Sequence, residues 1–138
     1  MTYEAKSSNR FKTPHLLVGW GEVIDKLTIL EIKSEKLIEP TALKNVKKEL
    51  SILRNIAQEP LELVSGLTVL KKQLAAVNRS LWRIEEQIRG KERKKKFDYR
   101  FISLARSVYK QNDKRARLKK KINILLNSDI IEEKSYKN

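Results

Sequence analysis

The chain has 138 residues and a formal net charge of +14, from 31 Lys or Arg and 17 Asp or Glu. Its length fits one domain, and four Gly and three Pro are too few for the many turns of a β-sandwich or barrel. The absence of cysteine excludes disulfides, thiolate metal sites and cysteine nucleophiles. No apolar run reaches the roughly 18 residues of a membrane span, and the first residues lack the apolar stretch of a signal peptide, so we expect a cytoplasmic protein.

Residues 1–14 are polar and without period, which predicts a flexible tail, and residues 15–127 are expected to form one domain. A first helix is predicted from about Gly21 to Ile38, because apolar side chains recur there at helical spacing. Two further residues, Ile29 and Ile32, lie off this stripe. They can either form the seam of a homodimer or contact the next helix, and the sequence does not decide between the two.

The middle of the chain shows the spacing of a coiled coil. Thr41 is predicted to cap a second helix over 42–57, whose apolar residues alternate steps of three and four. A third helix is predicted to follow Pro60 and to end at Gly90. Its nearly unbroken apolar stripe consists of Leu63, Leu67, Leu70, Leu74, Val77, Leu81, Ile84 and Ile88.

A fourth helix is predicted to start after the N-cap Asp98, with Phe97 placed for a hydrophobic staple, and to run to about Asn127. The short connector before it implies that the third and fourth helices form an antiparallel hairpin. The tail 128–138 either docks on the bundle or stays loose. The predicted fold is therefore all-α, an antiparallel bundle of about four helices with a long coiled-coil-like hairpin.

Several polar residues fall on helix faces that should be buried. Arg115 lies in the middle of the apolar stripe of the fourth helix, and a buried guanidinium needs an anionic partner. Glu31 is the predicted partner. The alternatives are a structural polar layer that fixes the register of the bundle and a ligand pocket between helices. The candidate ligand-binding residues are Glu31, Asn78, Trp82, Glu85, Asn112 and Arg115.

The positive charge is concentrated in the second half of the chain. Residues 1–69 carry ten Lys or Arg and nine Asp or Glu, whereas residues 70–138 carry 21 and eight. At 100° per residue, five basic residues of the fourth helix fall within an arc of about 80°. With the connector they give a candidate nucleic-acid surface: Lys94, Lys95, Lys96, Arg106, Lys110, Lys114, Arg117 and Lys121. The alternative is a solvated lysine-rich face without a partner.

Acidic residues offer a third, weaker candidate. Glu22 and Asp25 form an E-x-x-D pair on the first helix, and Glu85 and Glu86 are adjacent on the third. Helical nucleotide pyrophosphatases coordinate magnesium with such pairs, because hard cations prefer several carboxylate oxygens. Two carboxylates three residues apart are common in charged helices, so no metal or other cofactor is predicted. His15 is the sole histidine, which makes a Ser/His/Asp triad improbable.

Three separated blocks resemble a known family. They are Gly21–Lys33, which reads G-E-x-x-D-K-x-T-I-L-E-I-K, then Leu81–Arg89 and Tyr109–Asn123. The chain is similar to a family of small uncharacterised proteins of bacteria and their phages, for which no activity is assigned. Genes of that family are often found near polysaccharide-assembly genes, which is an association only. The residues that the resemblance maps are Glu22, Asp25, Lys26, Thr28, Glu31, Lys33, Trp82, Glu85, Asn112, Asp113 and Arg115.

The function expected from the sequence is binding rather than catalysis. The inner polar residues would hold a small anionic ligand or the side chain of a protein partner, with a link to surface-polysaccharide assembly suggested by the resemblance. The first alternative is nucleic-acid or ribosome binding through the basic face of the fourth helix. The second is a magnesium-dependent nucleotide phosphohydrolase that uses the acidic pairs.

Overall fold

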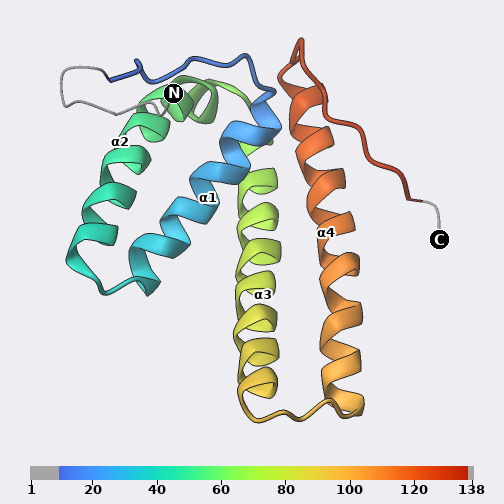
Figure 1. Cartoon of the computed structure of the whole chain (residues 1–138). Coiled ribbons are helices and arrows are strands. Elements are labelled where there is room, and N and C mark those ends of the chain that lie inside the picture. Colours follow the sequence, from blue (N-terminus) through green and yellow to red (C-terminus); the bar gives the residue numbers. More distant parts are fainter. Residues whose placement is uncertain (1–9, 137–138) are drawn as a thin grey trace, which may run out of the picture.

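The structure is a computed structural model that describes residues 10–136. Within this range it consists of four helices and no strand (Figure 1): α1 (Trp20–Lys36), α2 (Pro40–Leu63), α3 (Leu67–Arg93) and α4 (Tyr99–Leu125). The predicted all-α bundle is thereby confirmed. Of the predicted N-terminal tail, residues 1–9 lie outside the described part of the chain, and residues 10–18 form no helix.

The helices form two unequal pairs. Helices α3 and α4 pack closely as an antiparallel hairpin, as predicted, and α1 crosses the half of this hairpin that lies away from its turn (Figure 1). Helix α2 packs on α1 and makes little contact with α3. The turn end of the hairpin therefore projects beyond α1 and α2 (Figure 1).

The ends of α2 differ from the prediction. Glu39, not Thr41, caps its start, because the Glu39 carboxylate accepts hydrogen bonds from the main-chain N–H of Thr41 at 2.9 Å and of Ala42 at 2.7 Å. The predicted end at residue 57 is also wrong, since the helix continues through Pro60 to Leu63. A proline one turn from the end of a helix removes a single backbone hydrogen bond, which this helix tolerates.

The prediction that Gly90 ends α3 is wrong as well. The helix continues to Arg93, and Lys95 takes the left-handed conformation with φ of 54°. The N–H of Lys96 then bonds the carbonyl of Lys91 at 3.0 Å, and that of Lys95 bonds Glu92 at 3.0 Å, which is a Schellman motif. The predicted cap of α4 is confirmed, because the Asp98 carboxylate accepts from the N–H of Phe101 at 3.0 Å.

The main core lies where α1 crosses the hairpin. Its buried members are Ile24, Leu27, Leu30, Val46, Leu50, Ala57, Leu67, Leu74 and Ile122. For Ile32 the sequence allows either a homodimer seam or a contact with the next helix. Its side chain is 2% exposed within this single chain. In residues 10–136, no helix combines the length and apolar character that crossing a membrane requires.

Candidate functional site

The centre of the α1–α4 contact is a buried ion pair. The guanidinium of Arg115 donates from Nε to Oδ1 of Asp25 at 2.9 Å and from Nη2 to Oδ2 at 2.5 Å, which is the parallel two-bond geometry of an arginine–carboxylate pair. The Asp25 side chain is 1% exposed and that of Arg115 is 29% exposed. The carboxylate is therefore sealed inside the bundle, while the Arg115 side chain is partly open to solvent.

Two further side chains complete this site, which we call the Asp25 cluster: Asp25, Thr28, Asn78 and Arg115. The amide Nδ2 of Asn78 donates to Oδ1 of Asp25 and to Oγ1 of Thr28, both at 2.9 Å. The Thr28 hydroxyl donates in turn to the main-chain carbonyl of Asp25 at 2.7 Å. The cluster therefore connects α1, α3 and α4, and no buried side-chain polar atom among the described residues lacks a partner.

Helices α1 and α4 approach closely enough to form this cluster because a glycine, Gly21, lies in the first turn of α1 at the contact. A Cβ atom at Gly21 would lie 2.3 Å from the main-chain oxygen of Lys119. The N–H of Gly21 donates to Oδ1 of the buried Asn123 at 2.7 Å. One turn further along α1 this contact places Asp25 against Arg115, whose pKa is raised mainly by its hydrogen bonds to Asp25.

A second cation lies one turn along α4 from Arg115. The ammonium of Lys119 lies 2.7 Å from Oε2 of Glu22 and 3.0 Å from Oε2 of Glu132, and its side chain is 12% exposed. Burial lowers the pKa of Lys119, but the hydrogen bonds to Glu22 and Glu132 outweigh this effect and raise it. Lys119 thus remains charged at neutral pH although it is nearly buried.

Glu132 belongs to a non-helical segment, residues 128–136, that runs back along α4 (Figure 1) and that we call the C-terminal strap. The chain turns into the strap at Asn127, which has φ of 52°, and the N–H of Ser128 bonds the carbonyl of Asn123 at 2.8 Å. Its further contacts with α4 are Glu133–Lys120 at 3.1 Å, Lys134–Asp113 at 2.9 Å and the Tyr136 ring beneath Arg117 at 4.5 Å.

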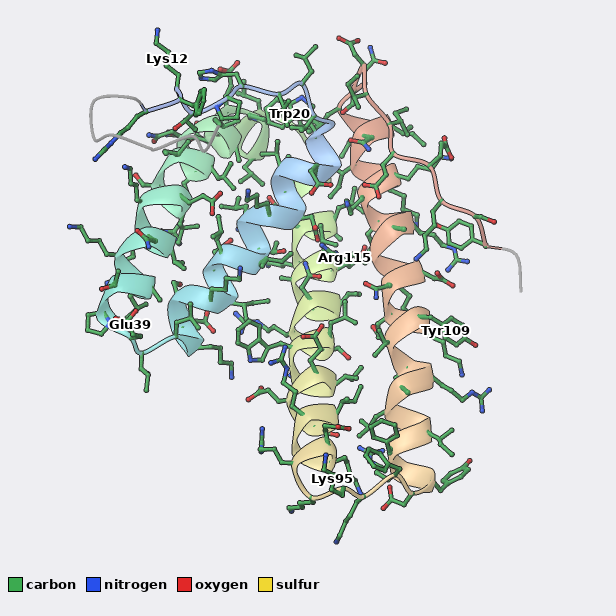
Figure 2. The ribbon with its side chains drawn as sticks, viewed as in Figure 1. Lys12, Trp20, Glu39, Lys95, Tyr109 and Arg115 are labelled. Atoms are coloured by element: carbon green, nitrogen blue, oxygen red, sulfur yellow. The ribbon has the colours of Figure 1, made fainter. Side chains whose placement is uncertain are left out.

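An open hollow of about 520 Å³ lies between α1, α4 and the strap, and we call it the α1–α4 hollow. Figure 2 shows Arg115 on the side of α4 that faces α1. The charged groups around the hollow are three cations and three carboxylates, and two of the carboxylates belong to the strap. Its lining residues include Glu22, Asn112, Arg115, Lys119, Glu132 and Lys134.

The structure brings together some of the predicted ligand-binding residues and not others. Asn78 and Arg115 meet in the Asp25 cluster, and Asn112 lines the α1–α4 hollow with Arg115. The predicted pair of Arg115 with Glu31 is wrong, because the carboxylate of Glu31 lies 3.1 Å from Lys71 instead. Asp25 and Glu31 are six residues apart, which places them about 120° apart around α1.

Trp82 and Glu85 do not join this site. They lie on α3, after the Arg79 that pairs with Glu35 of α1, and neither residue lines the α1–α4 hollow. Trp82 is half-buried and Glu85 is exposed. Their expected role in binding has no structural connection to the Asp25 cluster.

The predicted basic strip is Arg106, Lys110, Lys114, Arg117 and Lys121, all of which are exposed on α4. Arg117 packs on Tyr136, whereas the other four have no ion-pair partner within residues 10–136. At the turn of the hairpin Lys95 lies 3.8 Å from Glu92, while Lys94 and Lys96 have no such partner in the described chain. Figure 2 shows Lys95 at that turn.

The acidic pairs do not form one site. Glu22 is paired with Lys119 and Asp25 with Arg115, whereas Glu85 and Glu86 are exposed on α3. In the part of the chain that the structure describes, no group of three or more His, Cys, Asp or Glu side chains is placed to hold a metal ion.

Comparison with known proteins identifies a family but no activity. A family model described as a family of unknown function, DUF6165, matches residues 16–138. No curated protein and no solved structure matches the chain. The match covers the Asp25 cluster, the basic strip and the C-terminal strap, so the chain belongs to the family of unknown function DUF6165.

Proposed function

We propose that the protein is a non-catalytic binding or accessory protein that holds a small anionic ligand, or an anionic group of a partner, in the α1–α4 hollow. The observation that carries this proposal is the arrangement of Arg115. Its Nε and Nη2 are bound to Asp25, whereas its Nη1 has no hydrogen-bond partner within residues 10–136. A guanidinium fixed in this way on one edge keeps donors on the other for a phosphate or carboxylate.

Lys119 supplies the second positive charge of the site. Its ammonium is held between Glu22 and Glu132, and Glu132 lies on the strap with a side chain that is 66% exposed. An incoming anion would replace the carboxylate of Glu132 while Glu22 continues to position Lys119. Asn112, on the rim of the hollow, adds a neutral amide that can donate to the same anion.

Calorimetric titration with inorganic pyrophosphate tests this function. We expect saturable binding to the wild type and a loss of at least about tenfold in affinity in Lys119→Gln, because that variant removes a charge-assisted hydrogen bond from a half-buried site. The matched control is Lys91→Gln, which removes an equally charged, ion-paired lysine at the far end of the hairpin.

The outcomes separate the site from general attraction to a cationic protein. Equal loss in both variants, or no heat of binding in the wild type, would contradict the proposal. UDP-N-acetylglucosamine serves as the second probe, because the suggested link to surface-polysaccharide assembly implies a nucleotide-sugar diphosphate. Binding of pyrophosphate without the nucleotide sugar would retain the anion site and remove that link.

A further inference from the structure

The strongest unassigned surface is the outer face of α4, which carries positive charge that the fold itself does not use. The helix contains nine Lys or Arg and one Asp. Arg115 and Lys119 point into the bundle, Arg100 bonds Gln87, Lys120 pairs with Glu133 and Arg117 packs on Tyr136. The four remaining basic residues of α4 have no ion-pair partner within residues 10–136. They are Arg106, Lys110, Lys114 and Lys121.

These four charges are close enough to act together. With a rise of 1.5 Å per residue, Arg106, Lys110 and Lys114 follow one another at about 6 Å, and Lys121 extends the row to about 22 Å. The steps of about 6 Å between the first three are shorter than the screening length of about 8 Å at physiological ionic strength, so the fields of Arg106, Lys110 and Lys114 add, and Lys121 lies about 10 Å further along. The row is therefore suited to a linear polyanion rather than to a single small anion.

Two features at the turn of the hairpin extend the row. Tyr99 is 81% exposed and precedes Arg106 by seven residues, so its ring lies on the same face of α4, about 20° away around the axis. The same turn carries an open hollow of about 220 Å³ between α3 and α4, whose lining includes Lys91, Lys94, Lys96 and Arg100. The exposed ring of Tyr99 gives a platform for an unstacked base, and the basic hollow lies at the same end of the hairpin.

From these observations we infer that the outer face of α4 binds single-stranded nucleic acid, with phosphates along the basic strip and a base stacked on Tyr99. The inference is independent of the function proposed for the α1–α4 hollow. An anionic membrane surface fits less well, because Tyr109, on a neighbouring face, is the one exposed large apolar or aromatic residue between Arg106 and Lys121. Interfacial helices need an apolar face to insert between lipids.

The test measures binding of a fluorescent dT20 oligonucleotide by anisotropy at several salt concentrations. The strip variant carries Arg106→Gln, Lys110→Gln, Lys114→Gln and Lys121→Gln. Its control removes the same charge from exposed lysines elsewhere, through Lys44→Gln, Lys47→Gln, Lys48→Gln and Lys72→Gln. The slope of the logarithm of the binding constant against the logarithm of the salt concentration should become about 3 less negative in the strip variant, because each of the four lost phosphate contacts contributes about 0.7. In the control the slope should stay unchanged.

The stacking step is tested separately. Tyr99→Ala should weaken dT20 binding about tenfold without changing the salt slope, and Tyr99→Phe should bind as the wild type does, because stacking needs only the ring. An rU20 oligonucleotide shows whether RNA is bound equally. Equal behaviour of strip variant and control, no binding at low salt, or strip-dependent binding to phosphatidylserine vesicles without binding to dT20 would overturn the inference.

Discussion

The Arg115 guanidinium lies edge to edge with the Asp25 carboxylate, with Nε 2.9 Å from Oδ1 and Nη2 2.5 Å from Oδ2. The two residues are 90 positions apart and fix α4 against α1. The Asp25 side chain is 1% exposed, and within residues 10–136 Arg115 is the cation that pairs directly with its carboxylate. Removal of either charge therefore has a large and measurable effect on stability.

Arg115→Leu should lower the free energy of unfolding by about 3–5 kcal/mol, because it leaves a buried carboxylate without its counter-charge. The double variant Asp25→Asn/Arg115→Leu should be more stable than Arg115→Leu alone, since it removes the stranded charge as well. Urea unfolding measures both. Lys26→Gln, which breaks the exposed pair with Glu49, should change stability by less than about 1 kcal/mol. If the changes in unfolding free energy caused by Asp25→Asn and Arg115→Leu simply add in the double variant, the ion pair is not formed.

Replacement of Gly21 tests the close approach of α1 and α4. Gly21→Ala should destabilise the protein by about 1–3 kcal/mol, because its Cβ would lie 2.3 Å from the oxygen of Lys119 and the helices would have to separate. The control is Gly90→Ala, also within a helix, where the nearest atom would be 3.7 Å away. That change should stabilise the protein by about 0.5–1 kcal/mol through helix propensity. A lower melting temperature for Gly90→Ala than for Gly21→Ala would contradict the close packing of α1 on α4.

Part of this fold was predictable from periodicity, because apolar side chains at spacings of three and four determine which helix faces are buried. The hairpin and the Asp98 cap follow from such local signals. The partner of Arg115 was not predicted from such signals. Asp25 nevertheless lies on the face of α1 that also contains Gly21, Thr28 and Ile32, at steps of four, three and four residues. This face, which begins with a small residue, was the available signal for the Asp25 cluster.

Other features depend on contacts that no local pattern reveals. Gly90 is a residue type that often ends a helix. Here α3 continues for three more residues, to Arg93, and the Schellman motif forms around Lys95. The role of Lys119 requires the C-terminal strap, which reaches α4 from outside the helical region through Glu132. A segment without periodicity gives no indication of where it docks.

The acid stability of the hairpin turn should depend on Asp98. Its pKa is lowered chiefly by the hydrogen bond from Lys91 and also by the N–H of Phe101, so the charged carboxylate stabilises the fold above its ordinary pKa of 3.8. This contribution is lost as the pH falls through the depressed folded-state pKa. The melting temperatures of wild type and Asp98→Ala should therefore differ at pH 7, and the difference should shrink as the pH falls below 3.8. A difference that does not shrink in acid, or Asp129→Ala behaving in the same way, would contradict this assignment.

The strap should compete with ligands for Lys119. Glu132→Gln should raise the affinity for inorganic pyrophosphate by up to about fivefold, because the Glu132 side chain is 66% exposed and an ion pair to so exposed a carboxylate contributes at most about 1 kcal/mol. Glu59→Gln, which removes an exposed carboxylate of α2, is the control for the change in net charge. Calorimetry measures the affinity of both variants for pyrophosphate. An equal gain in affinity in each would show that Glu132 does not occupy the site.

Asp25 holds Arg115 in place so that the free edge of the guanidinium can receive an anion. The most direct test is the NMR signal of the Arg115 Nε–H group during a titration with inorganic pyrophosphate. We expect a signal that exchanges slowly with water before pyrophosphate is added and that shifts as the site is saturated. A signal that exchanges as fast as that of the exposed Arg106, or that does not respond to pyrophosphate, would contradict it.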